Sequence, residues 1–292
     1  MITPHLWYAT QAVEAAQLYC DAFGDAEILA VSEVRNTPSG DCDIVRFRIF
    51  EQYFQSISAG EMFPFTPAVS FTIRCSTAAE VDRYWSVLSE GGSQLMPLDH
   101  YPFSKRYGWV ADRTGLSWQI TLDAEGAARQ RVVPSLLFVG DAYGQAEAAA
   151  QHYTSVFDDA EVEHITRFGA DAAPDVEGGV MYGMFRLGGQ LFSMMESAHP
   201  HNFAFNGAVS FMVSCANQRE IDHYWGALSA VPAAEQCGWL QDRFGVSWQI
   251  VPAVMNEMMQ HGSREQVDRV TQAFLPMKKF DIAALERAFA QQ

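Results

Sequence analysis

The chain carries an internal repeat, which restricts its possible folds more than any other feature of the 292 residues. Residues 67–89 match residues 207–229 at 11 of 23 positions, at a constant offset of 140. A second block, 108–120, matches 238–250 at 9 of 13 positions and includes the pattern Asp-Arg-x-Gly-x-Ser-Trp-Gln-Ile. Such self-similarity indicates one structural unit that occurs twice. We therefore expect two domains, residues 1–131 and 132–254, followed by a tail, residues 255–292.

Each half is predicted to contain two modules with the order strand, helix and three strands. In the first module, residues 2–8 alternate as a strand and residues 12–23 form an amphipathic helix that ends at Gly24. The second module repeats this order, and Thr77 with Glu80 gives a capping-box pattern at the start of its helix. The expected fold class is α+β, with four β-α-β-β-β modules. The tail is predicted to form two helices around Pro276.

Composition and charge exclude several classes of protein. A hydrophobic content of 49% with 18% charged residues is typical of a globular chain with a sizeable core. The net charge, 19 − 35 = −16, opposes binding to a phosphate backbone, so no nucleic-acid partner is expected. No apolar stretch approaches the roughly 20 residues of a membrane span, and no secretory signal is visible. Five cysteines without a CxxC pair favour a reducing, cytoplasmic location.

The repeated motifs and the tail resemble the PhnB-like family. The motifs are Ala-Val-Ser-Phe-x-x-x-Cys, Glu-x-Asp-x-Tyr-Trp-x-x-Leu-Ser and the segment from Cys237 to Pro252, and the tail match covers Arg269 to Leu285. This family is also called 3-demethylubiquinone-9 3-methyltransferase-like. It belongs to the vicinal oxygen chelate superfamily, with glyoxalase, bleomycin-resistance proteins and extradiol dioxygenases. The resemblance implies tandem glyoxalase-like domains, each with two modules that form a U-shaped mixed sheet around a cavity.

The superfamily resemblance also implies a divalent metal, held by His or Glu side chains on strands one, four, five and eight of each domain. A metal needs carboxylates or neutral imidazoles that converge at these positions. Only one of the eight corresponding residues could bind a metal, and a shift of one residue on the first strand would add His5. No cofactor is therefore expected. The eight residues, in strand order and as first-half and second-half pairs, are Pro4 and Pro134, Ser58 and Glu196, Ala68 and Ala208, and Gln119 and Gln249.

Two candidate reactive groups occur in the second half alone. Glu196, His199 and His201 place a carboxylate and two imidazoles within six residues, a spacing that occurs at metal sites. The alternative is a polar loop. Cys237 is a candidate nucleophile, since a thiolate in a cavity attacks electrophiles. Its counterpart in the first half is Tyr107, and no His stands at a recognisable offset to act as its base.

A second set of residues points to a binding pocket. Gln119 and Gln249 occupy the place of a metal ligand, so they are expected to act as hydrogen-bonding groups in an otherwise apolar cavity. Aromatic side chains from neighbouring strands would form its walls. The alternative is that the chain's own 20 Phe and 12 Met side chains fill the cavities. The predicted ligand-binding residues are Tyr8, Trp109, Ser117, Gln119, Phe138, Trp239, Ser247 and Gln249.

The main functional hypothesis is metal-independent binding of a small molecule, with no assigned reaction. The alternatives are a metal-dependent lyase, isomerase or dioxygenase that uses Glu196, His199 and His201, and an interaction protein with filled cavities. The methyltransferase label has no support, because no Gly-x-Gly-x-x-Gly motif follows a strand. The two halves are expected to pair as an intrachain pseudo-dimer, and a further homodimer stays open.

Overall fold

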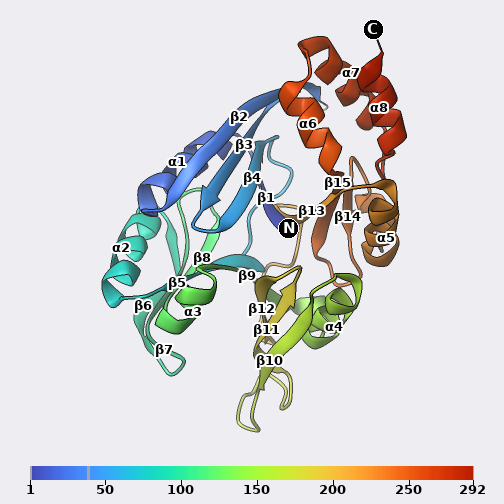
Figure 1. The fold of residues 1–292 in the computed structure, drawn as a ribbon. Coiled ribbons are helices and arrows are strands. Elements are labelled where there is room, and N and C mark those ends of the chain that lie inside the picture. Colours follow the sequence, from blue (N-terminus) through green and yellow to red (C-terminus); the bar gives the residue numbers. More distant parts are fainter. Residues whose placement is uncertain (1, 38–39, 292) are drawn as a thin grey trace.

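A computed structural model describes residues 2–37 and 40–291 (Figure 1). It contains two mixed β-sheets with helices on either side of them. Sheet A has seven strands in the order β14-β15-β13-β1-β4-β3-β2. Their bounds are β1 (Ile2–Tyr8), β2 (Ala26–Thr37), β3 (Gly40–Ile49), β4 (Gln52–Ser58), β13 (Val209–Cys215), β14 (Trp239–Gln241) and β15 (Ser247–Pro252).

Sheet B has eight strands in the order β10-β11-β12-β9-β5-β8-β7-β6. The helices α1 and α2 lie on one side of the two sheets, and α4 and α5 lie on the other side (Figure 1). The strands are β5 (Val69–Cys75), β6 (Ser93–Tyr101), β7 (Ser104–Ala111), β8 (Ser117–Leu122), β9 (Val132–Val139), β10 (Glu161–Arg167), β11 (Val180–Leu187) and β12 (Gln190–Ser197). The four helices are α1 (Ala12–Ala22), α2 (Ala78–Ser89), α4 (Ala146–Val156) and α5 (Gln218–Leu228).

The α+β class and the two-fold repetition are as expected, but the pairing of modules within each sheet differs from the expectation. Each sheet takes one module from each half, because β1 pairs with β13 and β5 pairs with β9, both antiparallel. No half closes a sheet by itself. The short connection of residues 123–131 explains the second pairing, because it places β9 directly beside β5. Hydrophobic periodicity predicts the strands, and it carries no information about which module pairs with which.

The last module also departs from the predicted pattern. It has three strands, β13, β14 and β15, where the other modules have four. A 3₁₀ turn at Pro232–Ala234 lies in the region that corresponds to β6. Another 3₁₀ turn, Gly140–Ala142, precedes α4. The ten-residue length difference between the halves thus corresponds to a strand that is missing from the second half.

The tail contains three helices where two were expected: α6 (Ala253–His261), α7 (Arg264–Phe274) and α8 (Ile282–Ala290). Pro276 lies between α7 and α8, as predicted. The additional break comes at Ser263, whose side chain and that of Gln266 form a capping box at the start of α7. A short helix in the connection, α3 (Ala124–Arg129), was also not anticipated. No helix in residues 2–37 and 40–291 is long and apolar enough to cross a membrane.

The hydrophobic core lies between the two sheets. Aromatic rings from both sheets meet there: Phe54 and Phe71 lie with ring centroids 5.0 Å apart, and Phe192 and Phe211 lie 5.4 Å apart. Each sheet therefore turns one face toward this core. Because successive residues of a strand alternate between faces, the opposite faces of the two sheets point away from each other. We call these opposite faces the polar face of sheet A and the polar face of sheet B.

Candidate functional site

Strand register places four polar side chains in one row across the polar face of sheet A. On β1, His5 lies opposite Ser210 of β13 and beside Gln55 of β4. Gln55 in turn lies opposite Arg46 of β3. Residues that face each other on neighbouring strands point to the same side of a sheet. The row therefore runs Arg46, Gln55, His5, Ser210, and it uses strands from both halves of the chain.

His5 lies at the centre of this row and is 3% exposed. Its ring meets the indole of Trp239 edge to face, with centroids 5.3 Å apart, and Trp239 also contacts Trp7 at 5.8 Å. Burial lowers the pKa of His5 to about 3, so the imidazole is neutral at neutral pH. A neutral imidazole offers one N–H donor and one acceptor. Within the described residues His5 makes no hydrogen bond, and its Nδ1 atom is buried.

Trp239 and Gln249 extend the polar face on β14 and β15, where they lie opposite each other. The Nε2 atom of Gln249 donates to Ser210 Oγ at 2.9 Å. In the described part of the chain, the Gln249 carbonyl oxygen accepts no hydrogen bond, and the Trp239 indole N–H has no acceptor. Gln55 likewise has no partner for its amide there. Sheet A thus presents several polar groups whose hydrogen-bonding capacity is unused.

The polar face of sheet B satisfies the equivalent groups within the protein. The counterpart of Trp239 is Trp109, which donates to Ser117 Oγ at 2.7 Å. The counterpart of Gln249 is Gln119, which accepts from Tyr107 at 2.8 Å and donates to Ser70 at 2.8 Å. The positions of Gln55 and His5 are occupied by Ser193 and Ser135, which bond to each other at 2.6 Å. The two faces therefore have equivalent positions on equivalent strands. They differ in how many of their polar groups form hydrogen bonds within the protein.

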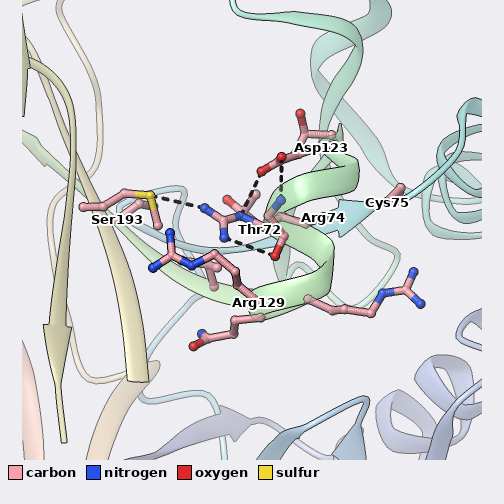
Figure 2. Close-up of polar contacts among 12 residues, drawn as sticks. Thr72, Arg74, Cys75, Asp123, Arg129 and Ser193 are labelled. Carbon is pink, nitrogen blue, oxygen red and sulfur yellow. Dashed lines mark hydrogen bonds and ion pairs between the residues drawn. The ribbon is translucent and has the colours of Figure 1, made fainter. Parts of the chain in front are cut away.

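Helix α3 and the side chain of Arg74 also lie against the polar face of sheet B (Figure 2). The buried Arg74 guanidinium lies 3.3 Å from Asp123 and donates to the carbonyl oxygen of Gly126 and to Met184 Sδ. Asp123 also caps α3 by accepting from the Gly126 N–H at 2.8 Å. A Cβ atom on Gly126 would lie 2.0 Å from Asp123 Oδ2, so glycine is required at this position. Met184 packs there with Val133 and Leu191.

The repeated Asp-Arg-x-Gly-x-Ser-Trp-Gln-Ile motif has a structural role at its Asp and Trp positions. In the first half, Asp112 accepts from the Trp118 indole at 2.8 Å and from Tyr19 of α1 at 2.9 Å. In the second half, Asp242 accepts from Trp248 at 2.8 Å and from Tyr153 of α4 at 2.7 Å. These bonds join the turn of one sheet to a helix packed on the other sheet. Burial raises the pKa of both carboxyls, although the hydrogen bonds that they accept oppose this effect.

The predicted ligand-binding residues fall into three groups in the structure. Trp239 and Gln249 lie on the polar face of sheet A, with Ser247, whose hydroxyl donates to Asn206 O at 3.2 Å. Trp109, Ser117 and Gln119 lie on the polar face of sheet B. Tyr8 and Phe138 point into the core instead, where Tyr8 bonds to Tyr19 and Phe138 packs on Phe205. Tyr8 lies three positions after His5, and Phe138 lies three positions after Ser135. Because side chains alternate between the two faces of a strand, this odd spacing turns both rings toward the core.

On three of the four strands, the residues named for the superfamily's metal positions lie outside the row of polar-face residues. Pro4 and Pro134 lie on the core-facing register of their strands, and the neighbouring His5 and Ser135 occupy the polar faces. On the fifth strand Ser70 and Ser210 take this place, two residues beyond the predicted Ala68 and Ala208. On the fourth strand of each sequence half, Gln55 and Ser193 are the residues that lie on the polar faces. Gln119 and Gln249 lie on the polar faces themselves.

The polar face of sheet A does not fit the implied metal. Its donors are one imidazole, two amides and one hydroxyl, from His5, Gln55, Gln249 and Ser210, and none of them carries a charge. Divalent metal sites in proteins are built from carboxylates, thiolates and several imidazoles. In residues 2–37 and 40–291, no group of three His, Cys, Asp or Glu side chains is arranged to hold a metal.

The alternative metal residues do not converge either. The two oxygens of Glu196 accept from the backbone N–H groups of Ala146 and Val180, at 2.8 and 2.9 Å, and so fix the start of α4. The corresponding Ser58 accepts from Ala12, the first residue of α1, at 3.2 Å. His201 bonds to Ser197 Oγ at 3.0 Å, and His199 is exposed. Glu196 is therefore a helix cap that has a counterpart in the first half.

Cys237 lies against the tail. Its backbone N–H donates to Met277 O at 2.7 Å, and its thiol contacts the carbonyl oxygen of Leu275 at 3.4 Å. Burial raises the pKa of the Cys237 thiol, which disfavours the thiolate that a nucleophile needs. The next residue, Gly238, has φ +82°, and a Cβ atom there would lie 2.4 Å from Phe280. This segment holds the tail in place.

Two hollows lie elsewhere in the molecule. One, of about 540 Å³, runs between α7 and α8 beside Ala273 and Ala288. The other, of about 280 Å³, lies between the start of α4 and the loop before β11, beside Tyr143 and Arg167. Among the described residues, neither hollow is lined by a buried side chain that lacks a hydrogen-bond partner, as His5 does on sheet A. The polar face of sheet A is therefore the stronger candidate site.

The comparison with protein families identifies the chain. A family model described as 3-demethylubiquinone-9 3-methyltransferase matches residues 1–121 and again residues 130–251. The chain belongs to this family. Its membership confirms the PhnB-like resemblance and the tandem arrangement. No curated protein matches the chain.

The chain is also similar to solved structures. A putative 3-demethylubiquinone-9 3-methyltransferase, a PhnB protein from Bacillus cereus, is 36% identical over 41% of this chain and 98% of its own, with a TM-score of 0.39. Glyoxalase I from Zea mays is 10% identical over 89% of this chain and 98% of its own, with a TM-score of 0.56. The second likeness shows that nearly the whole chain has the fold of glyoxalase I.

The sequence reasoning missed three residues of the row: Arg46, Gln55 and Ser210. Arg46 and Gln55 lie on strands that were predicted correctly, but no repeated motif marks them. Ser210 belongs to the repeated Ala-Val-Ser-Phe segment, and its serine was available as a signal. The alternation along that strand places Ser210 and Gln249 on one face once β13 is known to pair with β15.

Proposed function

We propose that the protein binds a small planar molecule on the polar face of sheet A without a metal. The observation that carries this proposal is the unused hydrogen-bonding capacity of His5, Trp239 and Gln249, which lie together beside aromatic rings. Of these groups, the Nδ1 atom of His5 is buried without a partner. Buried polar groups in native proteins nearly always have partners, so this atom calls for an explanation. A ligand that accepts from Trp239 and donates to Gln249 would supply these partners.

The asymmetry between the two sheets supports a single site per chain. On sheet B the equivalent residues form hydrogen bonds with one another, and Met184 and α3 cover that face. The duplicated unit thus leaves polar groups without partners on one face and pairs the equivalent groups on the other face. The filled-cavity hypothesis from the sequence accordingly describes sheet B better than sheet A.

Aromatic walls favour a planar ligand. The rings of Trp7 and Trp239 are partly exposed and contact each other, and Trp239 also contacts the buried His5. Flat apolar surfaces with a few fixed polar groups are typical of sites for small aromatic molecules. Methyl transfer is the activity in the family's description, and we assign no reaction to this chain.

The test is calorimetric titration with three bicyclic aromatic probes: 2-naphthol, 2-naphthamide and 2-naphthoate. We expect at least one probe to bind, and Gln249→Ala to weaken its binding roughly tenfold or more, the loss expected for one or two good hydrogen bonds. The matched control, Gln119→Ala on sheet B, should leave binding unchanged. The proposal is wrong if no probe binds, or if both variants weaken binding equally while their melting temperatures stay alike.

A further inference from the structure

We propose that the ligand of the polar face of sheet A is an aromatic carboxylate and that Arg46 binds its carboxylate group. This inference rests on the proposed function above and names the chemical class of the ligand. It starts from the place of Arg46 in the row that also contains Gln55 and His5.

Arg46 is a partly buried cation without a partner. Within residues 2–37 and 40–291 it makes no hydrogen bond and no ion pair. Arg48, two residues further along β3 and on the same face, is held by Asp25 at 2.8 Å and by Glu27 at 3.1 Å. The chain has 35 acidic and only 19 basic residues, so an arginine without an ion-pair partner is unexpected. Its guanidinium group is free to bind an anion that is not part of the protein.

The other groups of the site carry no charge, so Arg46 alone determines which ligand charge is favoured. His5 is neutral because burial lowers its pKa to about 3, and Gln55 and Gln249 are amides. An arginine binds a carboxylate through two parallel hydrogen bonds, and this pairing is stronger where solvent is partly excluded. An anion is thereby favoured at the Arg46 end of the row.

The spacing of the row fits a ligand with an acidic end and an aromatic end. Arg46 is on β3 and His5 is on β1, with β4 between them. Neighbouring strands are about 4.8 Å apart, so the two backbone positions are separated by roughly 10 Å. The aromatic rings of Trp7 and Trp239 lie at the His5 end. A bicyclic acid can place its ring system there and its carboxylate toward Arg46.

The polar face of sheet B lacks this charge at the matched position. Register places Met184 opposite Ser193 there, as Arg46 is opposite Gln55 in sheet A. Met184 packs in an apolar cluster with Val133, Leu191 and Tyr182. The unpaired cation therefore accompanies the unsatisfied groups of sheet A, whereas Arg74 on the polar face of sheet B is paired with Asp123.

The experiment compares 2-naphthoate with its uncharged analogue 2-naphthamide by calorimetric titration. We expect the wild-type protein to bind the acid at least tenfold more tightly than the amide, and Arg46→Gln to abolish this preference by weakening the acid alone. Arg46→Lys should keep part of the preference. Arg48→Gln is the matched control and should leave the preference intact, because Arg48 is already occupied by Asp25 and Glu27.

The outcomes separate this inference from the proposed function. If the wild-type protein binds acid and amide equally, or if Arg46→Gln keeps the preference for the acid, the inference is wrong. The proposed function then stands, provided that Gln249→Ala still weakens the binding of both probes. If neither the acid nor the amide binds, the inference is wrong, and if 2-naphthol fails to bind as well, the proposed function is also wrong. Melting temperatures of the Arg46 variants, measured in the same buffer, show whether a loss of acid binding reflects a loss of folded protein.

Discussion

His5 of β1 and Trp239 of β14 come from opposite halves of the chain, and their rings meet at 5.3 Å with an interplanar angle of 87°. They meet because β1 of the first half pairs with β13 of the second half, which in turn pairs with β15. The candidate site is thus a product of the exchange of modules between the halves. Neither half contains it alone.

The first prediction concerns the pH dependence of stability. Burial lowers the pKa of His5 to about 3, whereas an unfolded histidine has a pKa of about 6.5. Above pH 6.5 both states are neutral. Between pH 6.5 and 3 the unfolded chain takes up a proton that the folded chain rejects, so the free energy of unfolding falls by about 1.4 kcal/mol per pH unit.

The control for this prediction is His5→Gln, which lacks the titrating group. From pH 7 to pH 5 we expect the wild-type protein to lose about 2 kcal/mol more than the variant, measured by urea unfolding. Comparing the two proteins removes the contributions of other groups, such as Asp112 and Asp242. Identical pH profiles for both proteins would contradict the buried, neutral state of His5.

The second prediction concerns Glu196 as a helix cap. Replacing Glu196 with Ala removes the acceptor for two buried N–H groups, so we expect a loss of about 2–3 kcal/mol in the free energy of unfolding. The matched change Ser58→Ala removes one weaker bond at the start of α1 and should cost about 1 kcal/mol. If Glu196→Ala left stability unchanged and removed a stoichiometric metal, the cap assignment would be wrong.

The third prediction concerns the repeated aspartates. Asp112→Ala leaves the Trp118 indole and the Tyr19 hydroxyl without their buried acceptor, and Asp242→Ala does the same to Trp248 and Tyr153. We expect each change to lower the free energy of unfolding by about 1.5–3 kcal/mol. Urea unfolding measures this loss. Unaltered stability in both variants would show that the motif serves another purpose.

The fourth prediction concerns Cys237. Because burial raises the pKa of its thiol, alkylation by iodoacetamide at pH 7.5 should be slower than for the same residue in urea-unfolded protein. Mass spectrometry of the labelled peptide measures both rates. Cys237→Ser should leave probe binding unchanged. Rapid labelling of the folded protein, together with a loss of binding in the variant, would restore Cys237 as a reactive group.

Local patterns were sufficient to predict the strands. Residues 2–8 alternate clearly, and the predicted and observed bounds of this strand agree. The repeat also gave the correct number of modules. What local patterns do not contain is the pairing between modules, which depends on contacts between residues about 200 positions apart, such as His5 and Ser210.

The candidate site was predicted in part for the same reason. Gln249 and Trp239 were found because the repeat marks them and places them on neighbouring strands. Arg46 and Gln55 were missed, because their relation to His5 follows from register alone. Tyr8 was assigned to the site, although a shift of one residue along a strand moves a side chain to the opposite face. The register between neighbouring strands is therefore what could not be predicted from local sequence patterns.

The most direct test of the account is the number of ligands bound per chain. Titration of 2-naphthoate into the wild-type protein should give one site per chain, and His5→Ser should remove it, because this change gives sheet A the serine that sheet B has at the matched Ser135. The matched sheet B variant Ser135→Ala should keep one site. Two sites per chain, or one site that survives His5→Ser and is lost in Ser135→Ala, would contradict the assignment of binding to sheet A.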